Sequence, residues 1–282
     1  MTLRLTGAMS DVVVGRNRSW SLALTRWVQG GFLPGLCTLA VLAVWEAIAR
    51  AQVVPQAALP PLTRIISAMW ELLQQVVWWS NFQDTLIAWA IGLTLATLAG
   101  VSLGVIIGSS RRIHQSTAFV VEGLRPIPAI AILPVLILVV GTGLELKVMI
   151  VTLAAFWPIL VQTMAGVQDV DPVLHDTARI YRFGKRRLFV QVVIPSAMPY
   201  IATSLRLAAT LALLVSVGTE LVVGGTGIGV MIASAHNAGR EVLMWALICL
   251  TGILGISISA IFVKIERTTL HWHATQRKER PA

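Results

Sequence analysis

Six long apolar stretches constrain the fold of this chain more than any other feature of its sequence. A helix that crosses a membrane needs about 20 mainly apolar residues, and in lipid a helix satisfies all of its own backbone hydrogen bonds. We therefore expect an all-α integral membrane protein with six transmembrane helices. The expected spans are Phe32–Ala49, Leu86–Gly108, Pro126–Leu144, Val148–Gln168, Met198–Thr219 and Val242–Val263.

The charge distribution predicts how these spans are oriented. Charged residues make up 12% of the 282 residues, against about 25% in an average soluble domain. Most of the lysines and arginines lie in residues 1–31, 111–125, 169–187 and 264–282, which are separated by the spans. Loops rich in Lys and Arg stay in the cytoplasm, so we expect both termini there. The net charge of +9 then reflects topology, and we expect no nucleic-acid partner.

The chain divides into four regions on this basis. They are a basic cytoplasmic tail (1–31), the first span with an outer interfacial segment (32–84), the transmembrane core (85–263) and a second basic cytoplasmic tail (264–282). In the outer segment, Thr63 is expected to cap a helix over Arg64–Gln75. Glu46 and Arg50 are four residues apart and are expected to pair.

Small residues and prolines predict how the spans pack. Gly100, Gly104 and Gly108 recur on one helix face, which allows a second helix to approach closely. We favour a contact inside one subunit over a seam between two copies. Pro126 and Pro128 open the third span, and because proline obstructs the preceding turn, this helix starts late or bends. Both prolines are candidates for a pore or gate, and a kink without function is an equal alternative.

A basic, helix-forming segment of about thirty residues separates the fourth and fifth spans. Asp171 as the cap and Pro172 as the first helical residue indicate the start of a short helix. Leu174, Ala178 and Tyr181 then share one helix face by their spacing. The segment is therefore expected to begin with an amphipathic helix.

The rest of this segment predicts a turn and a second short helix. Asp176 and Arg179 are three residues apart and can pair on the surface. Gly184 is expected to end the first helix in the left-handed conformation. Two short helices would form a rigid projection at the cytoplasmic end of the bundle, suited to docking a soluble partner. A solvated loop that only satisfies the charge rule is the alternative that composition alone favours.

Motifs in and around this segment resemble those of a known family. Residues 176–179 hold an acid followed by small residues, and residues 188–199 hold an apolar patch that ends in two prolines. The further motifs are Leu59-Pro60-Pro61, Arg111-Arg112, Leu124-Arg125-Pro126-Ile127-Pro128-Ala129, Leu133-Pro134, Phe156-Trp157-Pro158-Ile159-Leu160 and Leu205-Arg206-Leu207-Ala208. Together they resemble the nitrate, sulfonate and taurine branch of the binding-protein-dependent ABC importer permeases, over nearly the whole chain after the first tail.

The resemblance implies the type I ABC importer permease fold and a transport subunit that is not itself an enzyme. It implies two copies that form a pore in the lipid of a bacterial inner membrane. ATP-binding ABC subunits, with ATP-Mg, would dock from the cytoplasm on Val173–Arg187, and an extracytoplasmic substrate-binding protein would deliver a small anion or zwitterion. The implied contact residues for the ATPase are Leu174, Asp176, Ala178, Arg179, Tyr181 and Gly184. The chain departs from the family in one respect: the expected glycine falls on Arg182, two residues before Gly184.

No catalytic, metal-binding or nucleotide-binding motif occurs in the sequence. The chain has no G-x-x-x-x-G-K-[ST] phosphate loop, and its glycine-rich run at 224–229 departs from G-x-G-x-x-G. Cys37 and Cys249 lie alone in apolar spans, without the spacing of a metal site. We therefore expect no cofactor in this chain and assign ATP hydrolysis to a partner.

Arg206 and Glu220 are the ionisable residues of the fifth span, and charges inside a membrane are costly and often functional. They are fourteen residues apart, about 21 Å along a helix, so they cannot pair with each other. We expect Arg206 to reach the cytoplasmic interface, with a pore-facing role as the alternative. Glu220 is expected to serve a gate or a structural hydrogen bond near the outer end.

Two other classes of function compete with an importer. A secondary transporter driven by an ion gradient needs acids or broken helices near the middle of the membrane, usually in repeated halves. Here the acids lie near span ends and no halves repeat. A membrane anchor without transport leaves the docking segment and the proline-broken spans unexplained. The importer is therefore the favoured prediction.

Overall fold

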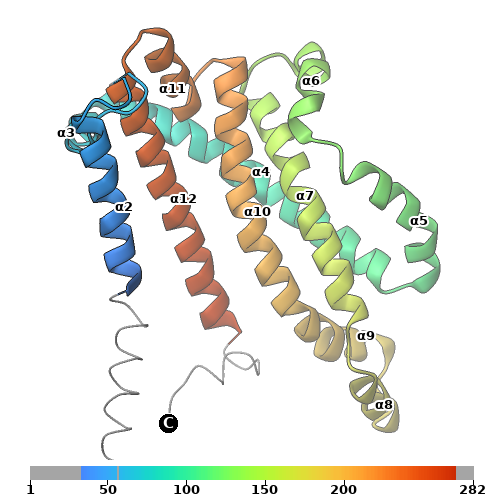
Figure 1. Ribbon diagram of the computed structural model, residues 1–282. Helices are drawn as coiled ribbons and strands as arrows, with labels where there is room; N and C mark the ends of the chain where they lie inside the picture. The colour runs from blue at the N-terminus through green and yellow to red at the C-terminus, as the bar shows by residue number, and fades with distance from the viewer. Residues whose placement is uncertain (1–32, 56, 271–282) are drawn as a thin grey trace, which may run out of the picture. The chain divides into compact units, whose positions relative to one another are not determined.

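The computed structural model describes residues 33–55 and 57–270, and within these ranges the secondary structure is helical, with no β-strand (Figure 1). The all-α prediction is therefore confirmed for the described part of the chain. The predicted tail over residues 1–31 lies outside the described residues, as does the second tail from residue 271 onward. The chain forms two compact units, one ending at Ser67 and the other beginning at Ala68.

The first unit contains α2 (Leu33–Arg50) and the start of α3 (Leu62–Leu73). The Glu46 carboxylate on α2 accepts hydrogen bonds from Arg50 Nε at 2.7 Å, Leu62 N at 2.6 Å and Thr63 Oγ1 at 3.1 Å. The predicted pair of Glu46 and Arg50 is confirmed. The predicted helix start at Thr63 is wrong, because α3 begins at Leu62. The first amide groups of a helix have no partner inside the helix, and here the carboxylate on α2 accepts hydrogen bonds from them.

The second unit contains the rest of α3 and all later helices. They are α4 (Val76–Gly108), α5 (Arg111–Leu124), the 3-10 helix η2 (Ala129–Ile132), α6 (Leu133–Val140), α7 (Leu144–Gln168), α8 (Pro172–Ile180), α9 (Lys185–Leu188), the π-helix η3 (Phe189–Val193), α10 (Ile194–Val223), α11 (Ile228–Asn237) and α12 (Glu241–Thr269). In the described part of the chain, four continuous helical stretches are long and apolar enough to cross a membrane: α4, α7, α9 through α10, and α12.

The third predicted span, Pro126–Leu144, is not a single helix. The stretch from Ala129 to Val140 is bent by 77° relative to α5, and Pro126 and Pro128 lie in the break. Proline removes a backbone donor and obstructs the preceding turn, which accounts for the position of the bend. Five of the six expected spans thus correspond to four continuous helices and one bent pair. The first predicted span corresponds to α2, which is not among the helices long and apolar enough to cross a membrane.

The fourth predicted span begins earlier than expected. The predicted bounds of the third and fourth spans leave residues 145–147 as the link between them, but Glu145 and Lys147 belong to the first turn of α7, which starts at Leu144. The actual link is residues 141–143, where Gly141 has a φ of 75°, a conformation that glycine adopts without strain. Lys147 is therefore part of a helix and not of an outer loop.

Helices α4, α7 and α10 pack against one another and form the core of the second unit (Figure 1). The row of Gly100, Gly104 and Gly108 on α4 faces α7. A methyl group added at Gly104 would lie 2.6 Å from Thr163 Cβ, so a side chain there has no room. The predicted contact inside one subunit is confirmed.

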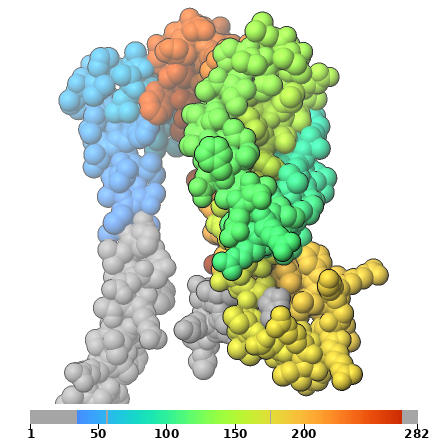
Figure 2. Space-filling model, turned by 90° about the vertical axis from the view of Figure 1, so that its right-hand side faces the viewer, coloured from blue at the N-terminus to red at the C-terminus, as the bar shows by residue number. Residues whose placement is uncertain are grey.

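The two ends of the long helices carry different structures. In Figure 1, α8 and α9 lie at one end of α7 and α10, and α6 and α11 lie at the other end. In Figure 2 the α8 region, drawn in yellow, forms one end of the second unit. The candidate residues of α8 and the candidate Glu220 therefore lie toward opposite ends of the long helices.

Candidate functional site

The first helix of the projection starts as its sequence predicts. Asp171 is the N-cap of α8, and its Oδ1 accepts a hydrogen bond from Val173 N at 2.8 Å. Pro172 is the first helical residue, where its missing amide hydrogen removes no intrahelical bond. The start of α8 is thus encoded locally by two adjacent residues.

The end of α8 differs from the prediction. Arg182, and not Gly184, adopts the left-handed conformation, with a φ of 49°. Arg182 N donates to the Arg179 carbonyl at 2.9 Å, and Phe183 N donates to the Ala178 carbonyl at 2.9 Å. These two bonds form the Schellman motif, whose left-handed position is usually a glycine. The prediction for Gly184 is wrong, because that residue is extended and begins α9.

Apolar and aromatic side chains are exposed along α8 and at its C-cap, Tyr181. Val173 is 67% exposed, Ile180 79% and Tyr181 72%. Of the face predicted to be shared by Leu174, Ala178 and Tyr181, only Ala178 is buried. An apolar patch of this kind at the end of a protein indicates an interaction site.

The predicted ion pair on α8 is present. Arg179 Nη1 lies 3.8 Å from Asp176 Oδ1, and both side chains are largely exposed. An exposed pair of this type contributes little to stability, about 0 to 1 kcal/mol. Both charged groups are therefore accessible to a partner.

The projection is anchored to the long helices by a small buried cluster. Val193 of η3 packs with Val167, Val170 and Ala197, so the segment is held between the end of α7 and the start of α10. The Arg187 guanidinium lies 4.3 Å from the centre of the Phe183 ring, a cation–π contact between the turn and α9. These contacts join the projection to the ends of α7 and α10.

A groove of about 800 Å³ lies beside α8. Asp171 and Leu174 line it together with Pro195 and Tyr200 from α10. The Tyr200 hydroxyl donates a hydrogen bond to Asp169 at the end of α7. The exposed helix and the groove together offer a partner both a ridge and an adjacent depression.

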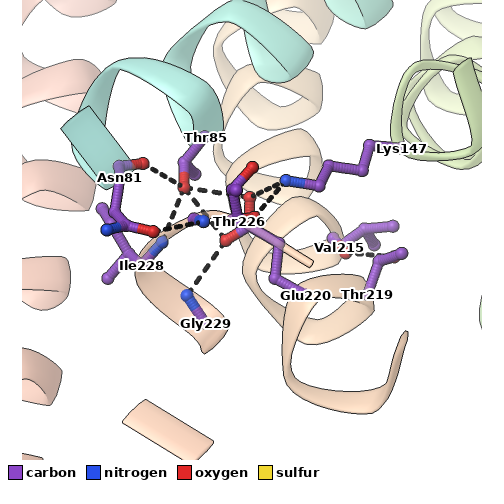
Figure 3. Close-up of polar contacts among 10 residues, drawn as sticks. Asn81, Thr85, Lys147, Val215, Thr219, Glu220, Thr226, Ile228 and Gly229 are labelled. Atoms are coloured by element: carbon purple, nitrogen blue, oxygen red, sulfur yellow. Dashed lines mark hydrogen bonds and ion pairs between the residues drawn. The ribbon is translucent and has the colours of Figure 1, made fainter. Parts of the chain in front are cut away.

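At the other end of the long helices, Glu220 is the centre of a buried polar network (Figure 3). Lys147 Nζ donates to Glu220 Oε1 at 3.1 Å and also to the Thr226 carbonyl. The carboxylate further accepts from Thr85 Oγ1, 2.9 Å from Oε2, and from Gly229 N at 3.0 Å. Glu220 is 0% exposed and Lys147 is 5% exposed. The predicted hydrogen-bonding role of Glu220 thus involves four separate segments of the chain.

The same network caps the start of α11. Gly227 N donates to Asn81 Oδ1 at 2.7 Å, and Ile228 N donates to Thr85 Oγ1 at 2.9 Å. The first amide groups of a helix have no partner inside the helix, and here side chains of α4 and α10 accept from them. The glycine-rich turn therefore presents its amides to Asn81, Thr85 and Glu220 and not to a phosphate.

The sequence alone does not predict the partners of Glu220. The span bounds place Lys147 in the link between two spans, and they leave Asn81 and Thr85 just before the second span. The signal that could have found Lys147 is its position beside a long apolar run, because an ionisable residue at membrane depth commonly has a partner of opposite charge. Asn81 and Thr85 carried no comparable signal.

The remaining candidates occupy separate positions. Arg206 Nη1 lies 3.7 Å from Glu266 Oε2 on α12, and Thr203 Oγ1 donates to Glu266 Oε1 at 3.2 Å. Pro126 and Pro128 are exposed in the bend between α5 and η2. Among residues 33–55 and 57–270, no group of three His, Cys, Asp or Glu side chains is arranged to hold a metal ion.

Comparison with known proteins places this architecture among transport proteins. The family described as "Binding-protein-dependent transport system inner membrane component" matches residues 96–271, which is more than half of the chain. The nitrate import permease protein of Leptolyngbya laminosa is 27% identical over 78% of this chain and 81% of its own length. The taurine transport system permease protein of Escherichia coli is 26% identical over 94% of this chain and 97% of its own length.

Further similarity is found to a sulfonate permease and to solved transporters. The putative aliphatic sulfonates transport permease protein of Bacillus subtilis is 28% identical over 87% of this chain and 88% of its own length. The inward-facing MetNI methionine ABC transporter has a TM-score of 0.60 at 21% identity, over 71% of this chain and 97% of that chain. A bacterial ABC transporter that imports alginate has a TM-score of 0.61 at 12% identity, over 90% of this chain and 99% of that chain. These two structures support the fold.

Proposed function

This chain belongs to the family of binding-protein-dependent transport system inner membrane components, and from that premise we propose that it is the permease subunit of an ATP-driven importer. It is a multi-pass transport subunit of the inner membrane and not an enzyme. The observation that carries the proposal is the projecting helix α8, which lies between two membrane-spanning helices and exposes Val173, Ile180 and Tyr181.

The proposed partner at α8 is a pair of ATP-binding ABC subunits. An apolar helix held rigidly at the end of a bundle transmits a push from a partner to the helices on either side of it. Leu174, Asp176, Ala178, Arg179 and Tyr181 are the proposed coupling residues, with Gly184 at the start of α9. Ala178 contributes by seating the helix on its own subunit, because it is 4% exposed. ATP-Mg would be bound by the partner.

The proposed pore is formed with a second permease copy. Pro126 and Pro128 are proposed gate elements, because the bend of 77° beside them interrupts a span. Broken helices in membranes are found where they line a cavity or pack against protein. Arg206 is proposed as a helix-pairing residue beside the pathway, since it pairs with Glu266 of α12.

The proposed orientation puts α8 and both termini in the cytoplasm. Lys185, Arg186 and Arg187 follow α8, and all three are exposed. Positively charged loops stay on the cytoplasmic side. The α10–α11 turn would then face an extracytoplasmic substrate-binding protein.

The proposed cargo is a small anion or zwitterion delivered by that binding protein. The support comes from the relatives, which are described as permeases for nitrate, aliphatic sulfonates and taurine. These compounds share a compact, strongly polar acidic group. The choice among them would rest with the binding protein.

The docking proposal is tested by charging the exposed face of α8. Val173→Asp is compared with Val76→Asp, because Val76 begins α4 and is also exposed, at 83%. We expect the first variant to lose most of the ATPase subunit that co-purifies with the tagged chain and most ATP-dependent uptake, since a carboxylate replaces an apolar contact. The control is expected to retain its full complement of ATPase. Full retention and uptake in Val173→Asp would exclude α8 as the docking site.

A further inference from the structure

The helices that flank the projection are also joined to each other at their far ends. Residues 169–193 connect α7 to α10 at one end. At the other end Lys147, in the first turn of α7, pairs with Glu220, in the last turn of α10. With 25 and 30 residues, the helices are about 37 Å and 45 Å long. The chain connection and the ion pair thus join the same two helices at points far apart.

The ion pair is built as a fixed contact. Both side chains are buried, and their further hydrogen-bond partners are Thr85, Thr226 and Gly229. A buried charge that loses its partner is strongly unfavourable. Separation of Lys147 from Glu220 is therefore energetically opposed.

The α10–α11 turn depends on this contact for its position. Gly224, Gly225 and Gly227 have positive φ angles of 82°, 94° and 126°, and glycine has more conformational freedom than any other residue. The turn has no side chains at these positions to hold it in place. Its position follows instead from the Lys147 bond to the Thr226 carbonyl and from amides that donate to the network.

We propose that Lys147 and Glu220 are positioning residues for transport, and that their ion pair makes α7 and α10 a single lever. A displacement of the α10–α11 turn at one end would then reach the α8–α9 segment at the other end. This inference rests on the proposed function, in which a binding protein acts at the turn and an ATPase acts at α8. Neither side chain contacts cargo in this arrangement, because both are buried within one subunit.

The first test measures the turn itself and needs no partner. Hydrogen exchange is followed at Gly227, Ile228 and Gly229 of the purified chain in lipid nanodiscs. Lys147→Met and Glu220→Gln keep the side-chain size but leave one buried charge without its opposite charge, so we expect exchange about a hundredfold faster. The double variant loses the Lys147 bond to the Thr226 carbonyl but leaves no unpaired charge, and acceptors for the amides of residues 227–229 remain on Asn81, Thr85 and the side-chain amide at position 220. Exchange should therefore return to within about tenfold of the wild type. Glu145→Gln, an exposed residue in the same turn as Lys147, is the control and should not differ.

The second test separates positioning from simple stabilisation. ATP hydrolysis by the permease–ATPase complex in proteoliposomes is measured with and without the binding protein, per assembled complex. We expect stimulation by the binding protein to fall about tenfold in both single variants. We expect it to stay low in the double variant, although the turn is protected again, because the ion pair that joins α7 to α10 is still absent.

The outcomes distinguish this inference from the function on which it rests. Normal stimulation in the double variant would reduce the pair to a structural role and overturn the inference, as would unchanged exchange at the turn in both single variants. Absence of ATP-dependent uptake by the wild-type complex would instead contradict the proposed function. A double variant with a protected turn and lost stimulation supports the lever.

Discussion

Arg182 adopts a backbone conformation that is ordinarily found in glycine. In the matching motif at the end of α11, Gly239 occupies the left-handed position with a φ of 63°, and Arg240 N donates to the Ala235 carbonyl at 2.9 Å. A residue with a side chain costs about 1–2 kcal/mol in this conformation. The turn between α8 and α9 therefore stores local strain that its other contacts offset, as is common at functional sites.

The strain at Arg182 predicts that a substitution to glycine is stabilising. Arg182→Gly removes the steric cost but adds chain entropy in the unfolded state, so α8 should gain about 1 kcal/mol against local unfolding. The measurement is hydrogen exchange at Phe183, whose amide closes the motif.

The reverse change provides the control for this prediction. Gly239→Ala at the end of α11 should weaken the protection of Arg240 by a similar amount, because alanine carries the side chain that this conformation disfavours. Faster exchange at Phe183 in the Arg182→Gly variant would show that the side chain of Arg182 holds the turn.

The contact between α4 and α7 depends on the absence of side chains along one row. A methyl group at Gly100 would lie 2.9 Å from Ile159 Cγ2, and one at Gly108 would lie 2.9 Å from Val167 Cβ. The β-branched side chains of α7 thus fill the space that each glycine leaves. Without a hydrophobic driving force between helices in lipid, such close packing is a main source of association.

Alanine in this row should destabilise the helix pair. Gly104→Ala places a methyl 2.6 Å from Thr163 Cβ, so we expect the chain to lose about 1–3 kcal/mol of stability through overpacking. The thermal unfolding midpoint in detergent is the measurement. Gly252→Ala on α12 is the matched control, because nothing lies within 4 Å of that position. Equal midpoints for the two variants would mean that the contact between α4 and α7 accommodates a methyl group and does not require glycine at position 104.

The two ends of the second unit differ in charge and in exposed chemistry. One end carries the basic segment that follows α8, and the other carries the α10–α11 turn with exposed Thr226 (Figure 1). This asymmetry predicts that the two ends lie on opposite sides of the membrane.

Labelling from one side at a time tests this orientation. With the native Cys37 and Cys249 replaced by serine, a cysteine at Arg186 should react with an impermeant maleimide only from the cytoplasmic side. A cysteine at Thr226 should react only from the outside. Labelling of both positions from the same side would contradict the proposed arrangement of the partners.

The sequence by itself determined those features that depend on near neighbours or on the partition of apolar residues into lipid. Asp171 and Pro172 start α8, the glycine row of α4 faces another helix, and Pro126 with Pro128 marks a bend. Each of these outcomes follows from the preferences of a few adjacent residues, so each could be predicted without knowing the rest of the chain.

Only the tertiary structure decided which charged residues meet and how the turns close. Lys147 and Glu220 are 73 residues apart, and Thr85 and Glu220 are 135 apart. Their pairing depends on where three helices end relative to one another, which no local pattern encodes. Arg182 likewise takes the left-handed position because the hydrogen bonds that close α8 require it there, while Gly184, the better residue for that conformation, lies two positions too late.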